Sequence, residues 1–195
     1  MDLLNKFKEG ILKVIGYLVP VFQYIPNASL WHGIMSIPLI SYLIAFLSYP
    51  NIAMMDFGFF FSYGAPWSYL AIFGGIFFLY SFFYQLFNRK KLITKGLYKY
   101  LRHPQYLGMI IMTLGLTLLC LNTSPIYPFV QEPFYDKSWI LFIWIAEALI
   151  YVLLAKIEDL SLKAKHGEEF LNYASKVPFM FPFFNLNKEK NRKNK

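Results

Sequence analysis

The stretch GLYKYLRHPQYLG, residues 96–108, decides how the rest of the chain is interpreted. It ends a basic, water-facing loop and begins an apolar run that continues to Leu121. Pro104 marks the change, because proline suits the first turn of a helix, where its missing N–H would have no partner. Arg102 and His103 therefore stand where a membrane helix begins, and the positive end of that helix favours anionic groups. This boundary between lipid and water is a candidate anion-binding site.

The composition places the rest of the chain in a membrane. The 195 residues are 57% hydrophobic and only 15% charged, which is too little charge to cover a soluble domain of this size. Several apolar runs approach the ~20 residues that a membrane helix needs. We predict an all-α integral membrane bundle, with a single domain over residues 1–187 and a basic tail over 188–195. The predicted spans cover, approximately, residues 30–49, 67–87, 104–121 and 138–155.

The N-terminal segment, residues 1–29, begins charged and becomes apolar from Ile11, and its apolar part is too short for a full span. We predict an interfacial helix, which would become a fifth span if it inserts. A cleaved signal peptide is the alternative, but the segment lacks a small-residue cleavage site and further spans follow it.

The basic residues indicate which way the bundle faces. If the N-terminus, the 88–103 loop and the C-terminal segment share one side, that side holds every one of the 19 lysines and arginines except Lys137. Such a bias makes that side cytoplasmic. The three histidines (His32, His103 and His166) are scattered, so we expect no metal site, and the one cysteine excludes an intramolecular disulfide.

An acidic pair, Glu158 and Asp159, stands where the last span is predicted to leave the membrane. These carboxylates could hold a cation or the hydroxyls of a ribose. The alternative, which the charge pattern alone favours, is a surface helix on which the acids balance nearby lysines. The helix should continue as an amphipathic segment from Lys156, with an interruption at Gly167.

Together the two segments resemble the membrane methyltransferases typified by isoprenylcysteine carboxyl methyltransferase and the phospholipid methyltransferases. The first segment supplies the residues of a Gly-x-Tyr-x-x-x-Arg-His-Pro-x-Tyr-x-Gly run: Gly96, Tyr98, Arg102, His103, Pro104, Tyr106 and Gly108. The second supplies an acidic pair, a glycine, two aromatics and a Val-Pro ending: Glu158, Asp159, Gly167, Phe170, Tyr173, Val177, Pro178 and Pro182.

The resemblance implies S-adenosylmethionine as cofactor and methyl transfer to a lipophilic acceptor. Arg102 and His103 would receive the cofactor's carboxylate through charge-assisted hydrogen bonds, and Glu158 with Asp159 would take its ammonium or ribose. Tyr106 would wall the pocket or face the sulfonium. The expected cofactor-binding set is completed by Tyr98, Pro104 and Gly108. The expected partners are the lipid bilayer and a phospholipid amine, an isoprenylcysteine carboxylate or a similar lipophile, with no nucleic acid.

The chain departs from this family pattern in two places. Its acidic pair is Glu-Asp instead of the commoner Glu-Glu, and Phe179 follows the Val-Pro where an arginine often lies. The second departure weakens a carboxyl-methylating assignment more than it weakens cofactor binding. The closest alternative is an NADPH-dependent sterol or steroid reductase, which carries a similar Arg-His-Pro segment but more often has Asn where this chain has Gln105. A non-catalytic membrane subunit is the third interpretation.

Glu147 lies half-way along the fourth predicted span. An intramembrane carboxylate is costly and usually faces the bundle interior. The spacing puts Glu147, Tyr151, Leu154 and Glu158 near one helical face. We predict that Arg102, Glu147 and Glu158 take part in catalysis, with Glu147 as a base or polar anchor beside the acceptor. A structural, protonated glutamate is an equal alternative.

Overall fold

A computed structural model describes residues 28–47, 66–88, 92–122 and 138–181. Within these ranges the chain is helical, with no strand. The elements are α2 (Ala28–Leu47), α5 (Pro66–Phe87), the short 3-10 helix η1 (Gly96–Lys99), α6 (Pro104–Asn122) and α7 (Ser138–Lys176). The predicted basic tail and nearly all of the predicted N-terminal helix lie outside the described residues.

Three helices, α5, α6 and α7, are long and apolar enough to cross a membrane. The 20-residue α2 is the fourth helix, and its stretch Gly33–Leu47 is also apolar. Each observed helix begins within two residues of a predicted span, which confirms the predicted all-α membrane bundle. The helix of the fourth span continues into the amphipathic segment as far as a kink at Gly167, and both parts belong to α7.

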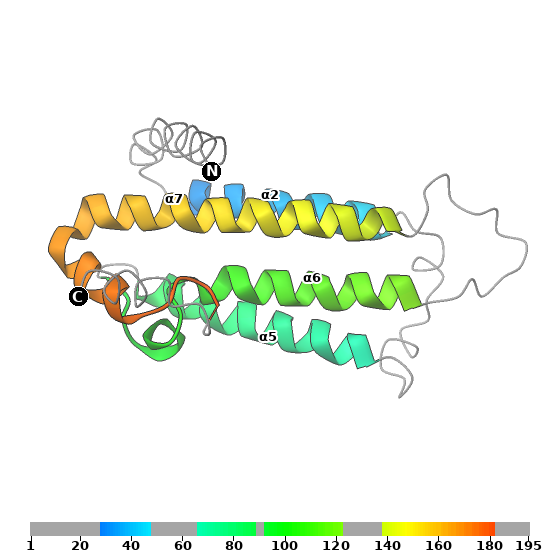
Figure 1. Ribbon diagram of the computed structural model, residues 1–195, viewed down its shortest axis with the longest axis horizontal. Helices are drawn as coiled ribbons and strands as arrows, with labels where there is room; N and C mark the ends of the chain where they lie inside the picture. The colour runs from blue at the N-terminus through cyan, green and yellow to red at the C-terminus, as the bar shows by residue number, and fades with distance from the viewer. Residues whose placement is uncertain (1–27, 48–65, 89–91, 123–137, 182–195) are drawn as a thin grey trace, which may run out of the picture.

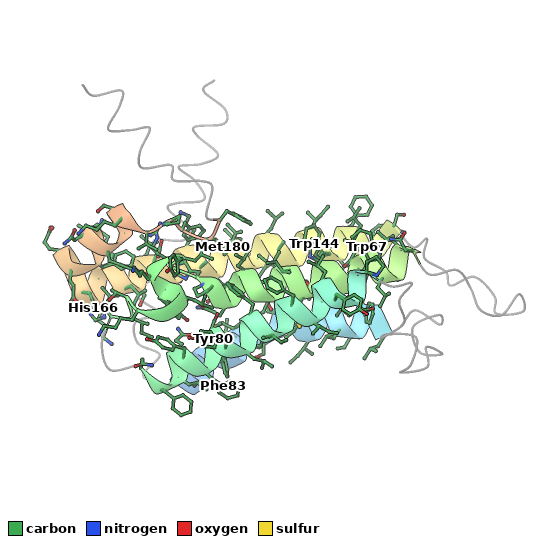
Figure 2. All side chains as sticks on the ribbon, turned by 90° about the horizontal axis from the view of Figure 1, so that it is seen from below. Trp67, Tyr80, Phe83, Trp144, His166 and Met180 are labelled. Atoms are coloured by element: carbon green, nitrogen blue, oxygen red, sulfur yellow. The ribbon has the colours of Figure 1, made fainter. Side chains whose placement is uncertain are left out.

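The helices form one bundle in which α5 packs on α6, α6 packs on α7, and α2 packs against both α7 and α6 (Figure 1). Large apolar side chains such as Tyr80 and Phe83 cover the outer surface, where a bilayer would contact them (Figure 2). The apolar exterior is what a bundle surrounded by lipid needs, because no water is available there to solvate polar groups.

Glycines allow α5 and α6 to approach closely. A Cβ on Gly74 would lie 2.3 Å from the backbone nitrogen of Met112, and one on Gly115 would lie 2.4 Å from that of Ala71. Small residues at such a contact let two membrane helices meet backbone to backbone. The adjacent Gly75 faces only the Met112 side chain, at 3.5 Å, so Gly74 is the residue that the contact requires.

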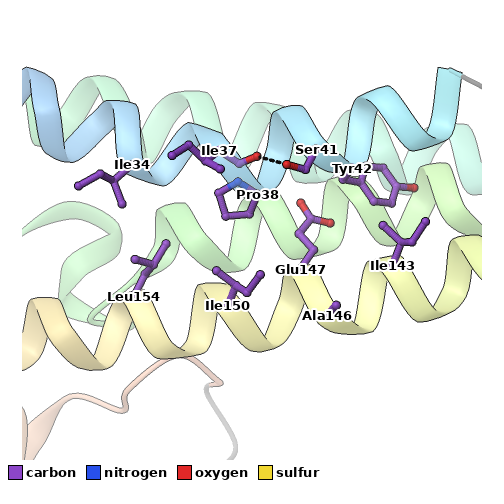
Figure 3. Close-up of a pocket in the computed structure, with 10 residues that line it drawn as sticks. All are labelled: Ile34, Ile37, Pro38, Ser41, Tyr42, Ile143, Ala146, Glu147, Ile150 and Leu154. Atoms are coloured by element: carbon purple, nitrogen blue, oxygen red, sulfur yellow. Dashed lines mark hydrogen bonds between the residues drawn. The ribbon is translucent and has the colours of Figure 1, made fainter. Parts of the chain in front are cut away.

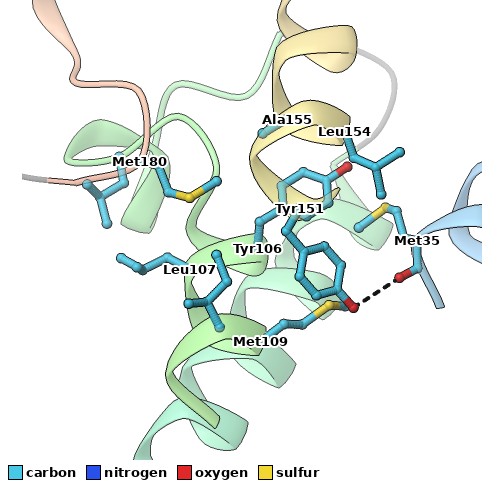
Figure 4. Close-up of a cluster of buried hydrophobic side chains, with 10 residues drawn as sticks. Met35, Tyr106, Leu107, Met109, Tyr151, Leu154, Ala155 and Met180 are labelled. Carbon is cyan, nitrogen blue, oxygen red and sulfur yellow. Dashed lines mark hydrogen bonds between the residues drawn. The ribbon is translucent and has the colours of Figure 1, made fainter. Parts of the chain in front are cut away.

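The buried core between α2, α6 and α7 contains two aromatic rings in contact (Figure 4). The centroids of Tyr106 and Tyr151 are 5.7 Å apart, and neither side chain is exposed. The Tyr151 hydroxyl donates to the Met35 carbonyl at 3.2 Å, so it fixes α2 against α7.

A kink at Gly167 ends the straight part of α7. Its φ of 50° lies in the left-handed region that glycine tolerates best, and the chain then turns back toward the bundle (Figure 1). After the helix, the Pro178 carbonyl accepts the Arg102 backbone N–H at 3.1 Å. The fold therefore brings together the two segments that the family resemblance had linked.

Candidate active site

The centre of the site is a polar cluster of four side chains: Arg102, His103, Glu158 and Asp159. Asp159 bridges the two cations, because Arg102 Nη1 donates to its Oδ2 at 2.6 Å and His103 Nε2 lies 2.8 Å from its Oδ1. The four side chains are between 1% and 14% exposed. The loop before α6 supplies both cations and α7 supplies both carboxylates, so the cluster also ties these elements together.

The two carboxylates of this cluster favour the protonated form of His103. Burial alone would lower its pKa, but hydrogen bonding and charge attraction from Asp159 and Glu158 outweigh burial and raise the pKa above 6.5. Its second nitrogen, Nδ1, is 3.5 Å from Glu158 Oε2. The cluster therefore contains two cations and two anions, and its formal charges cancel.

Two amide side chains also bind Glu158. Gln85, at the end of α5, donates to Oε1 at 3.2 Å, and Gln105, in the first turn of α6, donates to Oε2 at 3.5 Å. Neither glutamine was predicted from the sequence to be a site residue. Both are polar residues within a helical turn of a predicted membrane boundary, a position that does not by itself indicate a partner.

Tyr98 orients one of these amides. Its hydroxyl is 3.0 Å from Gln105 Oε1 and donates there or to the Ser81 carbonyl at 3.3 Å. Tyr173 in turn donates to the Tyr98 carbonyl at 2.6 Å. Burial raises the pKa of Tyr98 and of Tyr173 above that of a free tyrosine, so both remain protonated donors. Tyr98 thus supports the site through Gln105.

Phe179 follows the Val-Pro pair, where the family resemblance had led us to expect an arginine. Its ring centroid lies 5.2 Å from that of His103, 5.4 Å from the Arg102 guanidinium carbon and 3.9 Å from Lys156 Nζ. A ring in contact with cations stabilises them through its quadrupole and shields them from water. Here the residue after Val-Pro covers the polar cluster and brings no charge of its own.

The remaining predicted cofactor residues lie at the start of α6. Pro104 and Tyr106 are buried, and the Tyr106 ring is 5.8 Å from that of His103. Gly108 faces α5, where an added Cβ would come within 2.6 Å of the Phe78 backbone nitrogen. Gly108 therefore has a packing role, and a cofactor contact for it stays a prediction.

Glu147, which was predicted as a catalytic residue, lies farther along α7 and apart from the polar cluster. It precedes Glu158 by eleven residues on α7, a separation of about 16 Å along the helix axis. The predicted shared face is present, because Glu147, Tyr151 and Leu154 are all buried toward the bundle interior.

The polar cluster has the chemistry to receive an amino-acid group. Arg102 Nε is buried and donates no hydrogen bond among the described residues, and His103 Nδ1 has only the long contact of 3.5 Å to Glu158, so both cations have donor capacity for a ligand. Glu158 is 14% exposed, and its partners among the described residues, Gln85, Gln105 and His103, lie 3.2 to 3.5 Å away. Available cationic donors beside an available carboxylate fit the carboxylate and ammonium of a methionine moiety.

Comparison with known proteins shows similarity to the isoprenylcysteine methyltransferases, both in a family model and in individual relatives. Residues 75–143 match the sequence model of the isoprenylcysteine carboxyl methyltransferase (ICMT) family. The chain is 33% identical to protein-S-isoprenylcysteine O-methyltransferase B of Arabidopsis thaliana over 49% of this chain and 41% of the plant protein. It is 29% identical to the human protein-S-isoprenylcysteine O-methyltransferase over 47% of this chain and 28% of that protein.

A relative named for a different acceptor matches equally well. The chain is 30% identical to methanethiol S-methyltransferase of Crocosphaera subtropica over 48% of this chain and 30% of the relative. Each match spans less than half the length of the curated relative. No solved structure matches the chain significantly. The resemblance inferred from residues 96–182 is confirmed, and the relatives differ in the acceptor that their names give.

Proposed function

We propose that this relative of the isoprenylcysteine carboxyl methyltransferases is a membrane enzyme that transfers a methyl group from S-adenosylmethionine to a lipophilic acceptor. The observation that carries the proposal is the polar cluster, where two cations with available donors face two carboxylates at one end of an apolar bundle. S-adenosylmethionine, when bound, supplies a methyl group made electrophilic by the attached sulfonium.

The chain's own residues would hold and orient the cofactor. Arg102 and His103 bind its carboxylate, and Glu158 binds its ammonium while Gln85 and Gln105 keep that carboxylate in place. Asp159 positions both cations. None of these groups needs to shift a proton during the reaction, because methyl transfer depends mainly on alignment of the nucleophile with the methyl carbon.

The cofactor would enter the site from water, and the acceptor would enter it from the lipid bilayer. The polar cluster lies at the end of α6 that follows the basic loop, which the positive-inside bias assigns to the cytoplasm. The helices beside it are apolar outside, so an acceptor dissolved in the bilayer reaches the bundle laterally.

The charge balance favours this function over an NADPH-dependent reductase. A nucleotide with several phosphates needs a site with excess positive charge, since each buried phosphate charge must be compensated. The polar cluster has equal numbers of cations and anions, which suits a zwitterionic amino-acid moiety better than a polyanion.

Methyl transfer can be tested directly. The purified full chain in lipid nanodiscs is incubated with S-adenosylmethionine carrying a tritiated methyl group and with a lipid extract, and the organic phase is counted. We expect label in the organic phase with the wild type and background counts with Arg102→Met. Background counts with the wild type, together with oxidation of NADPH in the same extract, would contradict the proposal.

A further inference from the structure

A lateral groove runs between α2 and α7 and is separate from the polar cluster (Figure 3). Its volume is about 310 Å³. The lining residues are mainly aliphatic, with one carboxylate among them: Ile34, Ile37, Pro38, Ser41, Tyr42, Ile143, Ala146, Glu147, Ile150 and Leu154. Ile37 and Ile150, on its two sides, are exposed on the outer surface, so the groove is accessible from the bilayer.

Glu147 projects into this groove from α7 (Figure 3). Its side chain is 97% buried, since its relative exposure is 3%, and neither carboxylate oxygen accepts a hydrogen bond among the described residues. A carboxylate in such surroundings costs several kcal/mol unless it finds a partner. A ligand that enters the groove can provide that partner.

The hydroxyl groups near Glu147 are engaged elsewhere. Ser41 donates to a carbonyl of its own helix at 2.9 Å. Tyr42 donates to the Thr113 carbonyl at 2.9 Å or bonds to the Thr117 hydroxyl at 2.7 Å. Thr113 donates to carbonyls of its own turn at 3.0 and 3.3 Å. Thr113 is the hydroxyl that comes nearest to bonding Glu147, but its single proton is directed to its own turn, so the carboxylate keeps acceptor capacity for a ligand.

A second acceptor comes from the backbone of α2. Pro38 lies inside this helix and lines the groove. Because proline has no N–H, it cannot donate to the Ile34 carbonyl one turn earlier, and Ile34 lines the groove as well. The groove thus combines a buried carboxylate with a helical carbonyl that lacks its usual donor.

We propose that this groove binds the ammonium group of a lipophilic amine, with Glu147 as its counter-ion. An ammonium brings three N–H donors and one positive charge, which matches a site with acceptors, a carboxylate and no donor to spare. The apolar body of the ligand packs against the aliphatic lining and extends into the bilayer.

The charge of the lining restricts the ligand further. The described lining residues include no lysine or arginine. A ligand carboxylate beside Glu147 would place two acids together in an apolar site, and a phosphate would remain without a cation. The preferred ligand is therefore an amine on an apolar chain that carries no anionic group.

Photoaffinity labelling in nanodiscs of phosphatidylcholine tests this site. The probe is a single-chain alkylamine with a diazirine in the chain, and the matched probe has a carboxylate in place of the amine. We expect the amine probe to label peptides of α2 and α7, and unlabelled dodecylamine, but not dodecanoate, to compete. No S-adenosylmethionine is present, so failure here and failure of the proposed methyl transfer are distinguishable.

Two variants separate the amine site from a merely apolar groove. Glu147→Gln keeps the shape and removes the charge, and Ala146→Phe fills the groove without changing the carboxylate. Glu147→Gln should lower labelling by at least about tenfold, the loss expected when one charge-assisted hydrogen bond is removed. Ala146→Phe should also lower labelling, because the larger side chain occupies the space of the ligand. Glu168→Gln, which neutralises an exposed acid elsewhere on α7, should leave labelling unchanged.

Three results would overturn the proposal. They are equal labelling by the amine and carboxylate probes, labelling that survives Glu147→Gln, and labelling by the amine probe that maps outside α2 and α7. Helical content measured by circular dichroism confirms that each variant is folded before it is labelled.

Discussion

Two groups of carboxylates on the same helix have opposite surroundings. Asp159 and Glu158, near the polar end of α7, are surrounded by cations and amides. Glu147, about 16 Å away along the axis, lies among aliphatic side chains and accepts no hydrogen bond from the described residues. The comparison teaches that acidic residues in a membrane bundle can serve two purposes, one as part of a pre-assembled network and one as an acceptor kept for a ligand.

The largest expected effect is on the stability of the polar cluster. Asp159→Ala leaves Arg102 and His103 with one buried carboxylate between them, and breaking such a network costs about 3–5 kcal/mol. We expect a much lower thermal unfolding midpoint in detergent. Glu168→Ala, on the exposed surface of the same helix, is the control and should unfold like the wild type. If Asp159→Ala leaves the thermal unfolding midpoint unchanged, the contacts of Asp159 with Arg102 and His103 contribute nothing to stability.

The next effect concerns cofactor affinity. Arg102→Met and Glu158→Gln each remove one charge-assisted interaction with the methionine moiety, worth about 1.5–3 kcal/mol, which corresponds to roughly 10–100-fold in affinity. The measurement is the dissociation constant for S-adenosylhomocysteine by calorimetry. Affinities equal to that of the wild type in both variants would remove these residues from the site.

A smaller loss of stability and of cofactor affinity is expected when the Tyr98 hydroxyl, which orients the Gln105 amide, is removed. Tyr98→Phe leaves Gln105 Oε1 buried without the Tyr98 donor, at a cost of about 1–3 kcal/mol. We expect a lower unfolding midpoint and weaker S-adenosylhomocysteine binding. Tyr80→Phe is the matched control, because Tyr80 is 53% exposed on the outer surface. Equal losses in the two variants would contradict the support that Tyr98 gives to Glu158.

The ionisation of His103 should make the stability of the polar cluster depend on pH. Its pKa in the folded protein is raised above 6.5 by Asp159 and Glu158, against the effect of burial. The stability contribution is therefore fully present below pH 6.5 and is lost as pH rises through the folded-state pKa. The unfolding midpoint of the wild type should fall over that range relative to His103→Gln. A constant difference between the two proteins would indicate that His103 is not protonated.

The smallest effect is predicted for the isolated carboxylate. Glu147→Leu removes a buried group that forms no hydrogen bond with the described residues, so the free energy of unfolding should change by less than about 1 kcal/mol or should increase. Thermal unfolding of Glu147→Leu, measured beside that of Asp159→Ala, compares the contributions of the two carboxylates to stability. A loss comparable to that of Asp159→Ala would mean that Glu147 has a structural partner after all.

Much of the fold follows from the sequence because bilayer thickness fixes the length of apolar runs. The predicted spans 67–87 and 104–121 correspond to Pro66–Phe87 and Pro104–Asn122. The interruption at Gly167 is also confirmed. Hydropathy could not show that the helix of the last span continues into the amphipathic segment as far as the kink at Gly167, since composition changes at the membrane surface whether or not the helix continues.

The sequence predicted the members of the polar cluster more successfully than their contacts. From the motif spacing we predicted that Arg102, His103, Glu158 and Asp159 form one site. It did not predict that Asp159 contacts both cations, because that depends on how α7 is rotated against the loop before α6. Gln85 was missed for the same reason, since a single polar residue near the end of a span carries no indication of its partner.

The account depends most directly on which cofactor the polar cluster binds. We would titrate the wild-type protein in detergent with S-adenosylhomocysteine and, in a parallel experiment, with NADPH. The account predicts saturable binding of S-adenosylhomocysteine and none of NADPH. Saturable binding of NADPH without S-adenosylhomocysteine binding would contradict it and would support a reductase.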